Sequence, residues 1–178
     1  QDKFFGEFRE METDDRHRYI SFEPNKCISC ARCIRMCKEV LGLSVLGFEN
    51  RGFKTVVRPA MNKPLQETDC ISCGLCADAC PTGAIVIKPD TVKPGPFKLE
   101  TEETVCPFCS YGCRIEVKKI GNKIVGVKGK EDSETNLYGN ICKRARFGFM
   151  ELNNAARDKT SAIALEEAAD KAVKYINN

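Results

Sequence analysis

Hydrophobic and polar residues alternate in short runs along the first half of the chain, a pattern typical of β-strands. Two β-rich runs, 43–48 and 53–58, lie on either side of the sequence Glu-Asn-Arg-Gly at 49–52. We expect these runs to form a hairpin. A further run, Ala-Ile-Val-Ile at 84–87, predicts the strand that closes this part of the chain.

The second half of the chain shows two other patterns. Residues 114–120 and 123–128 alternate around Gly121-Asn122, which favours a two-residue hairpin turn. Further on, the apolar residues of 165–176 recur every three or four positions and predict a helix. Its apolar stripe is explained by ordinary packing against the cluster domain or a partner rather than by a cofactor site.

The N-terminal segment, 1–24, is charged and has no clear period. Its residues Phe4, Phe5 and Phe8 either belong to a disordered arm or pack on a neighbouring subunit. His17, the single histidine, lies among charged residues and is expected to be solvated rather than to bind a metal.

The cysteines carry the most specific chemistry. The twelve cysteines fall into three groups of four, and the first two groups read C-x2-C-x2-C-x3-C at an offset of 43 residues. This spacing is typical of two-cluster ferredoxins, in which the fourth cysteine of each run ligates the other run's cluster. The predicted ligands are Cys27, Cys30, Cys33 and Cys80 for the first cluster, and Cys70, Cys73, Cys76 and Cys37 for the second.

The third group has a different spacing, C-x2-C-x3-C followed by a long gap. Its members, Cys106, Cys109, Cys113 and Cys142, are the predicted ligands of a third [4Fe–4S] cluster. On spacing alone a zinc ribbon stays open here, because four cysteines also suit a structural zinc ion. A zinc-binding module is less compatible with the first two groups, since zinc is usually held by two separated C-x2-C pairs. A secreted disulfide framework is disfavoured by the same regular spacing.

Charge and hydropathy exclude some classes of function. The formal net charge is +3, but three oxidised clusters with four thiolates each would add about −6 and bring the total to about −3. The basic residues are therefore no argument for nucleic acid. No run of eighteen apolar residues is present, so no membrane span is expected, and no signal-peptide pattern precedes the first motif.

Several motifs resemble a known lineage. The sequence CPFCSYGC at 106–113 resembles the N-terminal [4Fe–4S] signature of molybdopterin-dependent oxidoreductases, and CKRARFG at 142–148 resembles their fourth-cysteine segment. Residues 24–28, 50–53 and 80–84 resemble a lineage of large iron–sulfur subunits. That lineage includes the large peripheral subunit of respiratory complex I, NADH-linked formate dehydrogenases and electron-transfer subunits of bifurcating hydrogenases.

The resemblance covers about residues 4–176 and also has departures. The molybdopterin enzymes carry Lys and Gly where this chain has Arg144 and Ala145, and 157–176 resembles only the first strand and helix of their pterin domain. A pterin active site is therefore not expected on this chain. The [2Fe–2S] domain and the histidine-ligated cluster that precede the ferredoxin module in the lineage are also not found. We therefore expect that an upstream domain was either trimmed or never existed.

Together, these observations predict an α+β fold. We expect a duplicated 2×[4Fe–4S] ferredoxin-like module, then a small β-rich [4Fe–4S] domain and a C-terminal helix. The predicted segments are an N-terminal arm (1–24), the ferredoxin-like domain (25–89), a linker (90–101), the molybdopterin-oxidoreductase-type domain (102–150) and a helical tail (151–178).

The predicted function is electron transfer through three [4Fe–4S] clusters, with no catalytic residue on the chain itself. By resemblance, the expected partners are a flavin and NAD-binding subunit and a catalytic subunit, either a hydrogenase, which is preferred, or a formate dehydrogenase. Soluble ferredoxin is a further expected partner, and the cytoplasm of an anaerobe is the expected location. The alternative is an N-terminal piece of a molybdopterin formate dehydrogenase.

Overall fold

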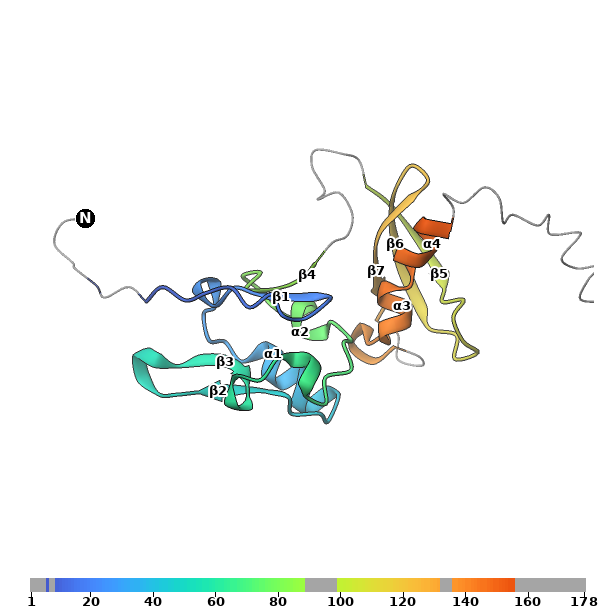
Figure 1. The fold of residues 1–178 in the computed structure, drawn as a ribbon. Coiled ribbons are helices and arrows are strands. Elements are labelled where there is room, and N and C mark those ends of the chain that lie inside the picture. The colour runs from blue at the N-terminus through green and yellow to red at the C-terminus, as the bar shows by residue number, and fades with distance from the viewer. Residues whose placement is uncertain (1–5, 7–8, 89–98, 132–135, 156–178) are drawn as a thin grey trace, which may run out of the picture.

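The computed structural model describes residue 6 and residues 9–88, 99–131 and 136–155. Short strands and helices follow one another along these ranges (Figure 1). They are β1 (Ile20–Phe22), α1 (Arg32–Arg35), β2 (Leu46–Glu49), β3 (Val56–Pro59), α2 (Leu75–Asp78), β4 (Ile85–Ile87), β5 (Glu100–Val105), β6 (Arg114–Ile120), β7 (Lys123–Gly129), α3 (Lys143–Phe147) and α4 (Phe149–Ala155). Single 3-10 turns lie at Pro24–Lys26, Gly52–Lys54, Ala60–Asn62, Leu65–Glu67 and Leu137–Gly139, and a π-helical turn, Met36–Val40, follows α1.

Two small antiparallel sheets form the first half of the molecule. β1 pairs with β4, so that Ile20 lies opposite Ile87, and β2 pairs with β3. The apolar sides of these sheets meet in one buried cluster. Its members are Ile20, Cys33, Leu46, Val57 and Ile85. A cysteine of the first predicted group therefore lies within the apolar core.

The predicted hairpin and closing strand are confirmed, with shifted bounds. The hairpin begins at Leu46 rather than at 43, because Gly42 and Ser44 have φ values of 70° and 51°, far from the φ of an extended strand. Phe53 lies in the 3-10 turn instead of in β3. β4 covers the predicted closing strand apart from its first residue.

The predictions for the N-terminal segment are wrong where the structure describes it. β1 belongs to the ferredoxin-like unit, and Ile20 is only 2% exposed. His17 is also buried rather than solvated, with 5% of its surface exposed. Neither fact was visible in the sequence, because β1 has three residues and charged side chains precede it. Phe4, Phe5 and Phe8 lie outside the described residues.

An antiparallel sheet in the order β5-β6-β7 forms the second half of the described structure. The predicted hairpin is confirmed, with Ile120 opposite Lys123 across the turn. β5 was not predicted, and it begins at Glu100, inside the segment interpreted as a linker. All six of its residues are exposed, so it carries no apolar alternation that a sequence pattern could reveal.

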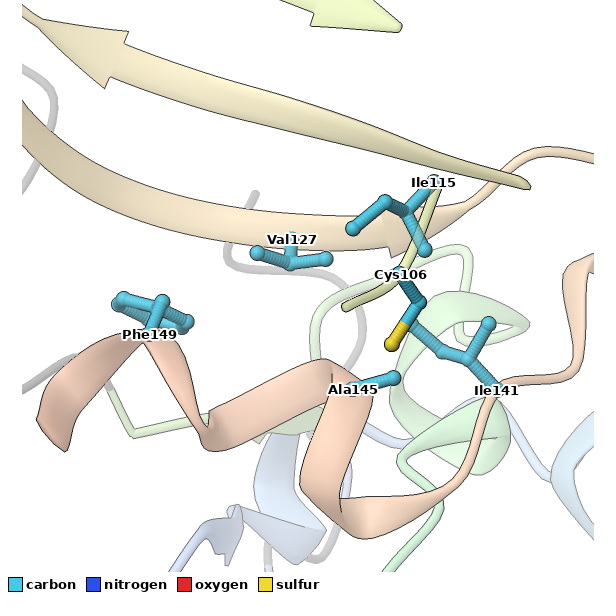
Figure 2. Close-up of a cluster of buried hydrophobic side chains, with 6 residues drawn as sticks. All are labelled: Cys106, Ile115, Val127, Ile141, Ala145 and Phe149. Carbon is cyan, nitrogen blue, oxygen red and sulfur yellow. The ribbon is translucent and has the colours of Figure 1, made fainter. Parts of the chain in front are cut away.

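The helices α3 and α4 cover β7, and a buried apolar cluster lies between them and the sheet (Figure 2). The cluster consists of Cys106, Ile115, Val127, Ile141, Ala145 and Phe149. Asn153 of α4 ties the helix to β7, because its amide donates to the carbonyl of Ile124 (2.7 Å) and accepts from the same residue's N–H (3.2 Å).

The described elements are small sheets with a few short helices, which is the α+β fold that the sequence predicts. The predicted helix at 165–176 lies outside the described residues. Within the described part of the chain, no helix has both the length and the apolar character needed to cross a membrane.

Candidate metal centres

The first predicted ligand set lines one small cavity. Its four thiols come from the loop before α1, from α1 itself and from the turn before β4. They are Cys27, Cys30, Cys33 and Cys80. Burial, together with the neighbouring thiols, raises the pKa of Cys33 to about 11. The structure thus brings Cys80 to the three cysteines of the other run.

The Cys80 sulfur lies in a different environment, although burial alone would raise its pKa. The N–H of Ile85 donates to this sulfur at 3.5 Å, and the hydroxyl of Thr82 lies 3.7 Å from it. These donors lower the pKa of Cys80 below its usual value. On the other side of the cavity, the N–H of Ser29 donates to the Cys27 sulfur at 3.4 Å. The donors to Cys80 stabilise its thiolate, which is the form that binds metal.

The second predicted ligand set lines another small cavity. Its members are Cys37, Cys70, Cys73 and Cys76, and the remaining walls include Ile20, Leu41, Leu43 and Gly74. Burial is the main cause that raises the pKa values of Cys70, Cys73 and Cys76. Cys76 is also within electrostatic range of Cys33, so the first two groups are neighbours. Here too, the fourth cysteine of one run joins the other run.

The backbone of the two cysteine loops repeats at the same 43-residue offset as the cysteines. Ser29 and Ala31 have φ values of 54° and 60°, and Ser72 and Gly74 have values of 57° and 78°. In each loop the second of these residues is the N-cap of a single-turn helix. Glycine adopts this left-handed conformation without steric cost, whereas Ser29, Ala31 and Ser72 adopt it against the usual preference of residues with a Cβ atom.

The third predicted ligand set is assembled from the turn after β5, the start of β6 and the start of α3. The thiol of Cys113 is within electrostatic range of Cys106, Cys109 and Cys142, and burial followed by these neighbours raises its pKa. Cys106 is buried, and its N–H donates to the carbonyl of Cys113 at 2.8 Å. Cys109 and Cys142 are exposed.

Two observations bear on what these groups could hold. All twelve cysteines are free, which leaves every thiol available as a ligand. Within the described ranges, no group of three or more His, Cys, Asp or Glu residues is arranged to hold a metal ion. A [4Fe–4S] cluster has a different requirement, because each of its four cysteines binds a different iron atom. The four cysteine sulfurs therefore lie farther apart than the four sulfurs around a single metal ion.

Two contacts beside these centres were missed by the sequence analysis. The buried His17 lies 3.1 Å from the hydroxyl of Ser72, in the loop that carries Cys70 and Cys73. Arg146 of α3 is also buried and forms an ion pair with Asp78 of α2, with 2.7 Å between Nη2 and Oδ2. These contacts depend on how the chain folds, and no spacing in the sequence signals them.

Comparison with known families identifies both halves of the chain. Residues 18–86 match the NADH-quinone oxidoreductase subunit 3 ferredoxin-like domain, and residues 99–154 match the molybdopterin oxidoreductase Fe4S4 domain. Residues 69–119 also match a 4Fe-4S dicluster domain. The chain belongs to the iron–sulfur lineage of these oxidoreductases.

Individual relatives in this lineage are much longer proteins. The NADPH-Fe(3+) oxidoreductase subunit alpha of Geobacter sulfurreducens is 35% identical over 78% of this chain and 16% of its own length. NADH-quinone oxidoreductase subunit 3 of Thermus thermophilus is 29% identical over 80% of this chain and 18% of its own length. The NADP-reducing hydrogenase subunit HndD of Solidesulfovibrio fructosivorans is 50% identical over 35% of this chain and 11% of its own length. The chain thus spans less than a fifth of these relatives.

Proposed function

We propose that this chain holds three [4Fe–4S] clusters and transfers electrons within an NAD(P)-linked oxidoreductase complex. The observation that carries the proposal is the exchange of Cys37 and Cys80 between the first two groups, because each cavity is then lined by four thiols. The proposed ligands are Cys27, Cys30, Cys33 and Cys80; Cys70, Cys73, Cys76 and Cys37; and Cys106, Cys109, Cys113 and Cys142.

The residues around the cavities fit such clusters. Thiolates are the ligands that iron–sulfur clusters use, and N–H groups that donate to sulfur are one means by which a protein sets their potentials. The N–H of Ser29 and that of Ile85 already donate to cysteine sulfurs of the first group. When bound, each cluster accepts and releases one electron at a time.

Binding of metal by these thiols is coupled to proton release. Burial keeps several of them protonated, since it raises the pKa of Cys33 to about 11 and also raises that of Cys73. Metal ligation requires thiolates, so assembly of the clusters displaces these protons. The apolar walls, among them Ile20 and Leu43, keep water away from the second cavity.

The proposed partners follow from the relatives. A flavin and NAD-binding subunit would exchange electrons with one end of the chain, and a catalytic subunit would exchange them with the other. We prefer a hydrogenase as the catalytic subunit, because the HndD subunit of an NADP-reducing hydrogenase is the relative that matches with 50% identity. We place the complex in a reducing cytoplasm, where free thiols persist.

The test is the metal content and spectrum of the chain purified without oxygen. We expect about twelve iron and twelve sulfide per chain, from three clusters of four irons each, and a broad absorption that dithionite bleaches. NADH, hydrogen and formate should not be turned over by the chain alone. Stoichiometric zinc without visible colour would contradict the proposal, and so would robust turnover by the isolated chain.

A second candidate is a piece of a molybdopterin formate dehydrogenase. It is favoured by the match of residues 99–154 to the molybdopterin oxidoreductase Fe4S4 domain. The native complex distinguishes the two candidates. Molybdenum and formate oxidation in the complex would favour this one, whereas hydrogen turnover without molybdenum would favour the hydrogenase.

A further inference from the structure

Arg146 connects the two halves of the molecule, because it lies on α3 and forms an ion pair with Asp78 of α2. It lies on α3, and its backbone N–H donates to the carbonyl of Cys142 at 3.0 Å. Its side chain extends to the other half and lies against Gly74, the residue after Cys73. A Cβ atom at Gly74 would stand 2.8 Å from Cδ of Arg146 and 3.0 Å from Nε.

The guanidinium of Arg146 is almost completely enclosed, with only 1% of the side chain exposed. Its Nη2 approaches Oδ2 of Asp78 to 2.7 Å, and 24% of that aspartate side chain is exposed. Among the described residues, however, no group accepts a well-directed hydrogen bond from Nε, Nη1 or Nη2. A buried charge with unsatisfied donors is costly, so these donors indicate an acceptor that the polypeptide does not supply.

Apart from the Asp78 carboxylate, candidate acceptors on this side of Arg146 are the sulfur atoms of the second centre, because Arg146 lies against Gly74. Gly74 lines the same cavity as Cys70, Cys73 and Cys76. The positive charge of Arg146 is within electrostatic range of the Cys73 sulfur. A ligated cluster is anionic and presents sulfur atoms that accept N–H hydrogen bonds.

We propose that Arg146 donates hydrogen bonds to the sulfur atoms at the Cys73 side of the second cluster and raises its reduction potential. This inference rests on the proposed function, because it requires a cluster at Cys70, Cys73, Cys76 and Cys37. Reduction adds one negative charge to the cluster, and a nearby buried cation stabilises the reduced form more than the oxidised form. Asp78 moderates this effect by offsetting part of the positive charge.

The position of Arg146 gives the effect a role in electron transfer between the centres. Its side chain reaches the second centre, while its backbone is hydrogen-bonded to Cys142, a proposed ligand of the third. A higher reduction potential favours the reduced form of the second cluster. Electrons are then held at the side of the ferredoxin-like unit that contacts α3. Arg146 is therefore a positioning residue that acts through the cluster and not a catalytic residue.

The test is a redox titration of the full chain, purified without oxygen and monitored by electron paramagnetic resonance. The signal of the second cluster is the one that Cys70→Ser alters. Arg146→Met should lower the ratio of reduced to oxidised second cluster about tenfold at a fixed ambient potential, which corresponds to about 59 mV for a one-electron couple. Arg146→Lys should cause a smaller decrease, because it keeps the charge but not the planar set of donors.

Two control variants separate electrostatics from loss of structure. Arg144→Met removes a charge from the same helix at an exposed position, and the second cluster should titrate as in the wild type. Asp78→Asn removes the counter-charge, so the ratio should increase, opposite in sign to the effect of Arg146→Met. A general loosening of the interface would instead shift the ratio of reduced to oxidised cluster in the same direction in Asp78→Asn and in Arg146→Met.

The outcomes also separate this inference from the proposed function. If the wild type contains no second cluster, the proposed function is wrong and so is the inference that depends on it. If the clusters are present and Arg146→Met, with full iron content, titrates as the wild type does, only the inference is overturned. If Arg146→Met loses iron, Asp78→Asn decides, and an unchanged or decreased ratio there overturns the inference.

Discussion

Tyr19 and Phe147 stack face to face across the two halves of the molecule, with ring centroids 4.1 Å apart and an angle of 11° between the planes. Tyr19 directly precedes β1, and Phe147 ends α3 one residue after Arg146. The stack and the ion pair between Arg146 and Asp78 therefore hold the same two surfaces together. It follows that the rings contribute to the contact between the two halves.

The first prediction concerns this stack. Tyr19→Ala and Phe147→Ala should each destabilise the holoprotein. A double-mutant cycle should give a coupling of about 1 kcal/mol, the order measured for aromatic pairs. Urea unfolding without oxygen, followed by far-UV circular dichroism, supplies the four free energies of unfolding. Phe48→Ala, at a half-exposed ring in β2, should change stability by less than about 0.5 kcal/mol. Additive effects of the two substitutions would contradict the prediction.

The second prediction uses two glycines that share a backbone conformation. Gly74 and Gly42 have φ values of 78° and 70°, but only Gly74 has a side chain in the way of a Cβ atom. Both alanine variants should lose about 1 kcal/mol of stability from left-handed backbone strain. Gly74→Ala should in addition displace Arg146 and lower the potential of the second cluster, whereas Gly42→Ala should leave it unchanged. Redox titration of the two variants makes the comparison. Equal potentials of the second cluster would show that the effect of Arg146 on that cluster does not require a glycine at position 74.

The third prediction tests the exchange of cysteines between the runs. Cys80→Ser should damage the cluster held by Cys27, Cys30 and Cys33 and leave the other one comparatively intact, because Cys80 lines only the first cavity. Cys37→Ser should have the reverse effect. Electron paramagnetic resonance of the reduced variants distinguishes the two. The assignment fails if each substitution damages the cluster of its own run.

The candidate ligands could be predicted from the sequence because ferredoxin spacing is local. Cys27, Cys30 and Cys33 lie within seven residues, so their approach requires only one loop and the first turn of a helix. The structure also brings Cys80 to this group, as the spacing predicts. That these thiols ligate clusters stays a prediction.

Other features could not be predicted, because they depend on contacts between distant segments. Arg146 is one of several basic residues after Cys142 in the sequence, and only the packing of α3 against Gly74 makes it different from the exposed Arg144. His17 lies among charges in sequence but contacts Ser72 in space. β5 has no buried residue, so its place in the sheet comes from backbone pairing with β6 and not from apolar alternation.

The fourth prediction concerns pH and His17. Its Nδ1 accepts the N–H groups of Tyr19 and Ile20, both at 3.1 Å, so a proton on Nδ1 would face two donors. Burial is the main cause that lowers the pKa of His17, with Lys88 and Lys143 adding to it and Asp14 opposing it. The folded state therefore binds this proton less readily than the unfolded state.

The sign of the effect follows from this lowered pKa. The contribution of His17 to stability is complete above about pH 6.5, its unfolded pKa, and is lost as the pH falls below that value, by at most about 1.4 kcal/mol per pH unit. His17→Gln should be less stable at pH 7.5 but should lose less between pH 6.5 and 5.5 than the wild type. Thermal unfolding of the iron-loaded proteins at these pH values measures the difference. Parallel curves would show that His17 does not titrate on unfolding.

The last prediction concerns removal of iron. The two apolar clusters of the described structure are small, and each contains a cysteine among its buried members, Cys33 in one and Cys106 in the other. A bound cluster joins the segments of the chain that carry its cysteines. Without metal, the thiols no longer make this connection. Binding free energy is then also folding free energy, as in other small metal-held domains.

Chelation of iron under anaerobic conditions should therefore abolish the cooperative thermal transition in circular dichroism and increase binding of a dye that reports exposed apolar surface. Addition of iron and sulfide to the reduced chain should restore both signals, which separates loss of metal from irreversible aggregation. Zinc added alone should not restore them. The reason is that one tetrahedral ion requires its four sulfurs about 2.3 Å from a single centre, and the described thiols form no group that could hold such an ion. A cooperative, native-like transition in the iron-free chain would instead show that the two apolar clusters, with the Tyr19–Phe147 stack, suffice to hold the fold.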